Sequence, residues 1–172
     1  MLTEKLLVEY LDRILVDKIQ FQTYIELQIT NKVLDLGEIF AETADQEQIR
    51  IDLAGINQYD GSIHFFEAEM QLHVQHPAIY RQFCDYCYLI CPDRQFDELD
   101  TETKQQQFDW ASEIGLGIIT ISDKGNMRVR IHANRQEMDP LIRREILRAM
   151  DARFKIRCET IPLWERTRSV IT

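Results

Sequence analysis

The sequence predicts a single α/β domain in which a mixed β-sheet is flanked by helices. Three observations lead to this class. The chain has 172 residues, a length that suits one domain with a core of ordinary size. Hydrophobic residues make up 45% and charged residues 28% of the composition, which is typical of a globular protein. Helix-like and strand-like segments alternate in the central part, which favours parallel strands in the middle of a sheet.

The first half of the chain is expected to contain one helix and two strands, with an ambiguous segment between them. In chain order these are a helix over 3–17, a segment over 20–43 that fits strand or helix and ends in a short helix near Glu42, and strands over 49–55 and 62–70. The first helix is indicated by apolar residues at the i, i+3, i+4, i+7 spacing. Asp60-Gly61 favours a hairpin between the two strands.

The second half is expected to continue with three strands and further helices. In chain order these are a helix over 76–86, a buried strand over 87–92, a polar loop with one or two helical turns over 97–115, strands over 116–122 and 127–133, and a helix over roughly 140–153. Pro77 is tolerated in the first turn of a helix, and Asp139-Pro140 opens the last one.

The net charge of −9 argues against a basic surface that coats nucleic acid. The charge is uneven, however. Residues 1–138 have a balance of −12, whereas residues 139–172 hold eight basic and five acidic residues, a balance of +3. This pattern fits a metal-binding body with one phosphate-facing element, or a solvated helix that pairs with its own acidic domain.

Cys84, Cys87 and Cys91 form a C-x2-C-x3-C pattern that could hold a metal. Cys87 and Cys91 belong to the apolar run CYLIC, however, so a place in the core is the simpler interpretation. No apolar run approaches the length of a membrane span, and the first residues do not resemble a signal peptide. These features predict a cytoplasmic protein without a membrane partner.

Two glutamates, Glu67 and Glu69, lie on the same face of the predicted strand 62–70, because alternate residues of a strand share a face. If the hairpin forms, Asp52 lies about one rung away. Clustered carboxylates repel one another, and a hard cation such as Mg²⁺ would offset their charge. Alternatively, the acids reach solvent or pair with basic residues such as Arg50 and Arg81.

Five segments carry a resemblance to a known superfamily. They are IRIDLAG, FFEAEM, YRQFCDYCYLICP, GLGIITISDKGNMRVR and DPLIRREILRAM. In their order and spacing they resemble the PD-(D/E)XK, or restriction-endonuclease-like, nucleases, and most of all the MmcB-like proteins connected with DNA repair. The resemblance covers roughly residues 48–150. It implies a core over that range, a helical extension over 1–45, and a basic helix and tail over 139–172.

The resemblance implies a nuclease that uses Mg²⁺ or Mn²⁺ to cleave DNA, with Asp52 and Glu67 as metal ligands. The lysine of the superfamily signature is replaced by Glu69. Three outcomes stay open: Glu69 serves as a base or third ligand, a cation such as Arg81 takes over the lysine's role, or the domain is inactive and acts as a binding or assembly module.

Further residues are candidates for accessory roles, each with a plain surface role as the alternative. They are an acid on an N-terminal helix (Glu38 or Glu42), a polar cleft residue (Gln71), two histidines near the cleft (His73 and His76), and DNA backbone contacts on the last helix (Arg143, Arg144 and Arg148). Many members of the superfamily dimerise, which makes a homodimer possible here.

Overall fold

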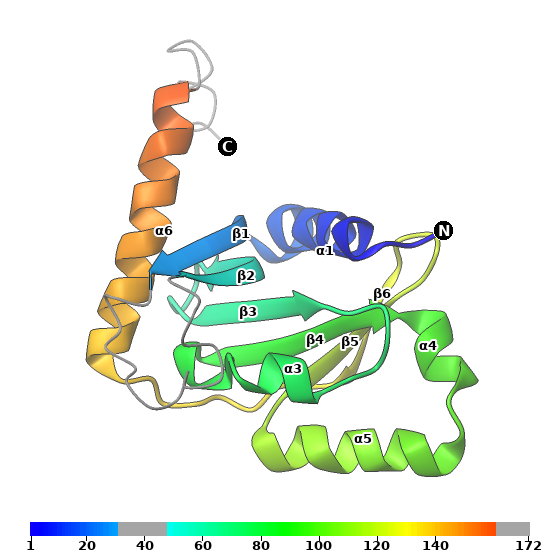
Figure 1. Ribbon diagram of the computed structural model, residues 1–172. Coiled ribbons are helices and arrows are strands. Elements are labelled where there is room, and N and C mark those ends of the chain that lie inside the picture. Colours follow the sequence, from blue (N-terminus) through cyan, green and yellow to red (C-terminus); the bar gives the residue numbers. More distant parts are fainter. Residues whose placement is uncertain (31–47, 161–172) are drawn as a thin grey trace.

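Six strands form one mixed sheet whose spatial order is the same as their order along the chain (Figure 1). The strands are β1 (Phe21–Thr30), β2 (Gln48–Asn57), β3 (Ile63–Ala68), β4 (Tyr86–Pro92), β5 (Gly117–Ile121) and β6 (Met127–Ile131). The computed structural model describes residues 1–30 and 48–160. Strands β3, β4 and β5 are parallel, and the other neighbours are antiparallel. The predicted class, an α/β domain with a mixed sheet and parallel central strands, is therefore confirmed.

Helices lie on both faces of this sheet (Figure 1). They are α1 (Glu4–Ile19), α3 (Gln75–Ala78), the 3₁₀ helix η1 (Arg81–Phe83), α4 (Asp93–Glu98), α5 (Thr101–Ile114) and α6 (Pro140–Thr160). Helix α1 begins where the sequence predicts, because the Thr3 hydroxyl accepts a hydrogen bond from the Leu6 N–H at 3.2 Å. The first 30 residues thus contribute a helix and an edge strand to the same sheet.

Two apolar clusters fix the layers. On one face, α1 buries a stripe of leucines against the sheet, and Leu11 and Phe66 are among the residues packed there. On the other face, Phe65, Ile146 and Met150 belong to a larger cluster that joins the sheet to α6 and the segment before β4. Cys84, Cys87 and Cys91 are free and buried. All three belong to this larger cluster, which supports their interpretation as core residues.

The helix predicted over 76–86 is wrong in extent. A four-residue helix and a short 3₁₀ helix take its place. A longer helix cannot form because Cys84 is already extended and the Asp85 N–H donates to the Ile63 carbonyl at 2.9 Å. The chain has therefore joined the sheet at Asp85.

The segment predicted as a polar loop over 97–115 instead contains the last two residues of α4 and the whole of α5. Asp100 caps α5 by accepting a hydrogen bond from the Thr103 N–H at 2.8 Å, and Gly115 ends it in the left-handed conformation. Only Gln107 and Ala111 of α5 are buried, so its apolar stripe is too weak for a periodicity argument.

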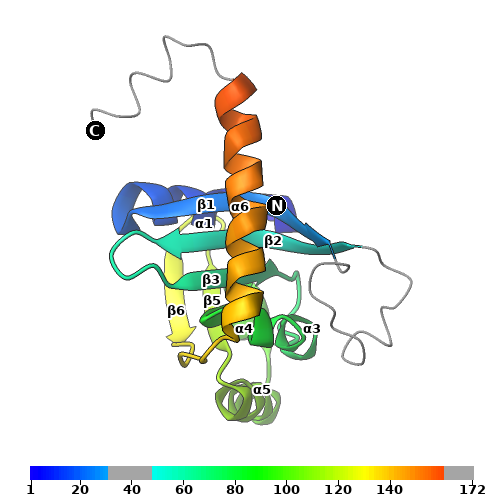
Figure 2. The ribbon, with the colours of Figure 1, turned by 90° about the vertical axis from the view of Figure 1, so that its left-hand side faces the viewer.

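Helix α6 begins at Pro140, as expected, but runs to Thr160 rather than to about residue 153. It crosses the sheet near β1 and β2, and its C-terminal part projects beyond β1 (Figure 2). In the described parts of the chain, no helix has the length and apolar character needed to cross a membrane. The predicted short helix near Glu42 and the candidate Glu38 fall outside the described residues.

Candidate carboxylate site

Asp52 and Glu67 lie side by side on neighbouring antiparallel strands. The register pairs Leu53 of β2 with Phe66 of β3, which puts Asp52 opposite Glu67. The Asp52 N–H donates to Glu67 Oε1 at 3.3 Å, and the Ala68 N–H donates to Asp52 Oδ2 at 3.0 Å. The predicted neighbourhood of the two acids is thus confirmed.

The environment of Glu67 strongly disfavours its charged form. The residue is 3% exposed. Burial, together with the nearby charge of Asp52, raises the pKa of Glu67 to about 9. Without a compensating positive charge, Glu67 is therefore protonated at neutral pH. A divalent cation beside Asp52 would favour the carboxylate instead.

Glu69 is paired with a histidine. Its main-chain N–H donates to the Ile90 carbonyl at 2.9 Å, which fixes the end of β3. One carboxylate oxygen contacts Nδ1 of His76, on α3, in a short hydrogen bond. The Glu69 carboxylate therefore has a histidine as its partner.

Tyr80 belongs to the same neighbourhood. Its ring stands edge-on to the His76 ring, with 5.9 Å between the ring centroids. Burial raises the pKa of Tyr80 to about 12. The charges of Glu67 and Asp52 act in the same direction, and the charge of Arg50 opposes them. Glu67, Asp52 and Arg50 therefore all lie close enough to Tyr80 to affect its ionisation.

No three or more histidine, cysteine, aspartate or glutamate side chains within the described ranges form a group that could hold a metal ion. Glu69 therefore does not complete a three-ligand group with Asp52 and Glu67 in this arrangement. The candidate cation site consists of two carboxylates. Such a pair fits Mg²⁺, which usually keeps several waters and binds through one or two carboxylates plus substrate phosphate.

An open cleft of about 400 Å³ lies between α1 and the strands β1 and β2. Most of its lining residues are charged: Glu4, Lys5, Glu9, Glu26, Arg50 and Asp52. Asp52 thus lines the cleft and also belongs to the carboxylate pair. The sequence pattern pointed to Arg50 as a possible partner of the acids, but it gave no sign of the cleft or of Glu26.

Arg81 makes its hydrogen bonds elsewhere. Its side chain is buried and donates to the Asn134 carbonyl at 2.6 Å and to the Asp85 carbonyl at 3.5 Å. These bonds tie the start of β4 to the segment that follows β6. Gln71 and His73 are exposed beyond the end of β3.

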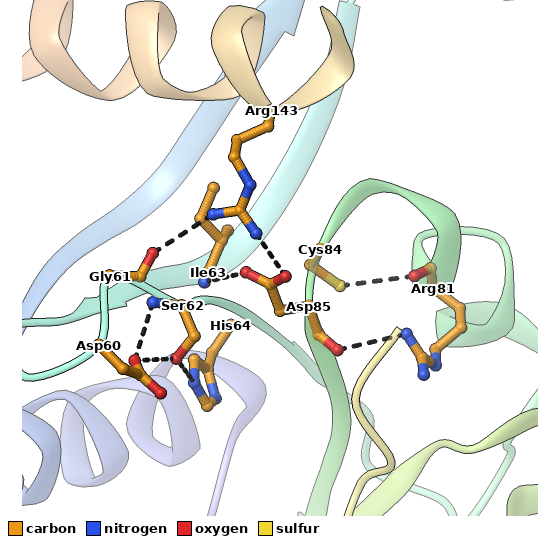
Figure 3. A network of polar contacts seen from close by, with 9 residues as sticks. All are labelled: Asp60, Gly61, Ser62, Ile63, His64, Arg81, Cys84, Asp85 and Arg143. Atoms are coloured by element: carbon orange, nitrogen blue, oxygen red, sulfur yellow. Dashed lines mark hydrogen bonds and ion pairs between the residues drawn. The ribbon is translucent and has the colours of Figure 1, made fainter. Parts of the chain in front are cut away.

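The arginines predicted to contact DNA are engaged within the protein. Arg143 forms an ion pair with the buried Asp85 and donates to the Gly61 carbonyl at 3.4 Å (Figure 3). The Asp85 carboxylate also accepts a hydrogen bond from the Ile63 N–H at 2.8 Å. Arg144 and Arg148 both contact Glu145.

No family model and no curated protein matches this chain. Among solved structures, the chain is similar to SPO1766, a protein of unknown function from Silicibacter pomeroyi. The two share 16% identity with a TM-score of 0.57, over 91% of this chain and 93% of that one. At this identity, the similarity shows a shared fold and carries no function.

Proposed function

We propose that this protein is a metal-dependent nuclease that cleaves phosphodiester bonds of DNA on a restriction-endonuclease-like fold. The observation that carries the proposal is the buried Asp52–Glu67 pair, in which a cation would offset both burial and mutual repulsion. The element order supports it: an acid on β2, an E-x-E motif that spans the end of β3, short helices, and β4 parallel to β3. This is the order that the PD-(D/E)XK resemblance implies.

In this function Asp52 and Glu67 hold the cation and leave its remaining positions to water and substrate oxygens. A bound Mg²⁺ or Mn²⁺ would lower the pKa of the attacking water and offset charge at the scissile phosphate. Glu69 contacts His76, so that a basic group is present at the end of β3 although the lysine is missing.

A second candidate is an inactive member of the same fold that acts as a binding or assembly module. The replacement of the superfamily lysine by Glu69 favours it, as does a candidate site of two ligands rather than three. Such a protein would bind neither Mg²⁺ nor Mn²⁺ at Asp52 and Glu67.

Cleavage of supercoiled plasmid DNA with Mg²⁺ or Mn²⁺ distinguishes the two candidates. We expect cleavage by the wild type, and a loss of more than about a hundredfold in Asp52→Asn and Glu67→Gln, because each removes a charged ligand. Glu113→Gln changes an exposed acid on α5 and should cleave like the wild type. Equal cleavage by wild type and Asp52→Asn, or no cleavage by any protein, would contradict the nuclease.

A further inference from the structure

We infer that Arg50 binds the substrate phosphate in the cleft between α1 and the strands β1 and β2, and that the phosphate replaces Glu26, the partner of Arg50 in the free protein. The inference rests on the proposed function, since it assigns a residue to the phosphate that the nuclease would cut. It gives the role expected of the missing lysine to a residue on β2.

Arg50 and Asp52 share the cleft. They are two residues apart on β2, and both line it. A phosphate oxygen that enters the cleft and binds a cation on Asp52 therefore comes close to the Arg50 guanidinium. This group is a planar fork of donors that matches phosphate oxygens in pairs, and it keeps its charge at any working pH. Lys5 of α1 also lines the cleft and adds a second positive charge.

Arg50 is available to a ligand. Its side chain is 62% exposed, and its ion pair with Glu26 spans 3.9 Å. Exposed pairs of this kind contribute little to stability, so an incoming phosphate can replace Glu26 as the partner of Arg50. Arg81 and Arg143 differ, because Arg81 is buried and Arg143 pairs with the buried Asp85.

Glu26 has a strained backbone. Its φ of 51° is unusual for a residue other than glycine. Conformations of this kind cost free energy and cluster at functional sites. Glu26 lies opposite Asp52, between the pairs Ile25–Leu53 and Leu27–Ile51.

Both strands change face at Glu26 and Asp52. Ile25 and Leu53 pack in the cluster under α1, whereas Leu27 and Ile51 pack in the cluster on the opposite face. In a regular strand, residues two apart would share a face. The irregularity therefore lies at Asp52, which lines the cleft and also belongs to the carboxylate pair. Glu26 lies beside Arg50 at the same place.

The charge of the cleft sets a condition on binding. Four of the charged lining residues are acidic and two are basic. A polyanion is therefore repelled until a divalent cation reduces the negative charge. We expect DNA binding to require both the cation and Arg50.

Fluorescence anisotropy of a short labelled DNA duplex in Ca²⁺ tests the inference, because it reports binding whether or not the DNA is cut. We expect Arg50→Ala to weaken binding about tenfold and to lower the slope of log affinity against log salt by about 1. Arg50→Lys should lie between this variant and the wild type, and Glu26→Gln should bind more tightly because it releases Arg50. Arg135→Ala, an exposed arginine near Asp60 at the other end of β3, should bind like the wild type.

Several results would overturn the inference: no binding by the wild type in Ca²⁺, equal binding by Arg50→Ala and Arg135→Ala, or weaker binding by Glu26→Gln. Circular dichroism melts of each variant exclude loss of folding. Arg50-dependent binding without cleavage in Mg²⁺ or Mn²⁺ would refute the nuclease and leave the inference standing. If Arg50→Ala changed neither DNA binding nor cleavage, the inference would be refuted and the nuclease would stand.

Discussion

Glu67 is buried in the sheet and is also one of the two proposed metal ligands. It belongs to a strand whose other side chains are mostly buried, and it accepts a hydrogen bond from the Asp52 N–H. Burial and the neighbouring acid raise its pKa to about 9. A glutamine would fill the same space without a charge to desolvate, so the presence of glutamate favours a role that needs the charge.

Without divalent cations, the free energy of unfolding of the wild type should fall, relative to Glu67→Gln, as the pH rises. Folded Glu67 keeps its proton up to about pH 9, whereas the unfolded chain loses it near the ordinary value of 4.5. Between these two pKa values the folded state binds more protons than the unfolded chain. The contribution of protonated Glu67 to stability is therefore full below pH 4.5 and declines as the pH rises to about 9. The slope approaches about 1.4 kcal/mol per pH unit.

Urea unfolding of both proteins between about pH 5 and pH 8.5 measures the difference. Titrating groups far from Glu67 affect both proteins alike and cancel. Mn²⁺ should restore stability to the wild type at the alkaline end, because an ion that binds only the folded state stabilises it. If the two proteins changed in parallel with pH, Glu67 would not hold a shifted pKa.

At this scale the sequence predicts some of the site and misses the rest. Alternation along β3 and the hairpin after Asp60 suffice to bring Glu67 next to Asp52. The contact between Glu69 and His76 depends on the path of the chain between them, which no local pattern fixes. The left-handed backbone conformation of Glu26 could not be predicted either, because glutamate rarely adopts it and only the surrounding packing enforces it.

Among the elements, α6 is attached to the sheet through a buried ion pair. Arg143 reaches from the helix to Asp85 at the start of β4 and to the turn before β3 (Figure 3). The Asp85 side chain is 2% exposed, so its charge depends on these donors. This arrangement assigns Arg143 a structural role, whereas the sequence pattern suggested a contact with DNA.

Arg143→Ala should therefore destabilise the protein by about 3–5 kcal/mol, because it leaves a buried carboxylate without its charged partner. Arg148→Ala removes an exposed ion pair on the same helix and should change stability by less than about 1 kcal/mol. Chemical denaturation of the two variants makes the comparison. Equal stability, with DNA binding lost only in Arg143→Ala, would instead support the role in DNA contact.

The elements that could be predicted from the sequence are those with a strong local signal. The leucine stripe of α1 and the Asp-Pro start of α6 are examples. The segment before β4 was predicted as one helix because its apolar residues suit a helix. The helix cannot continue to the end of this segment because the Asp85 N–H donates to the Ile63 carbonyl of β3. Helix α5 was missed because it depends on its caps and buries little apolar surface.

For the whole molecule, the sheet and its two helical layers follow from the alternation of apolar segments, while the function does not. The similarity to SPO1766 at 16% identity shows that very different sequences adopt this fold. A fold alone does not determine activity, which depends on a few side chains at one site. With a net charge of −9 and an acidic cleft, this protein would repel a polyanion, so the proposed function requires a cation that reduces this charge.

A crystal structure of the protein grown with Mn²⁺, with anomalous scattering used to locate the ion, tests the central claim most directly. We expect an anomalous peak within coordination distance of carboxylate oxygens from both Asp52 and Glu67, and no such peak in Glu67→Gln. A wild-type structure without this peak, in which the two carboxylates keep their hydrogen bonds to the Ala68 and Asp52 N–H groups, would contradict it.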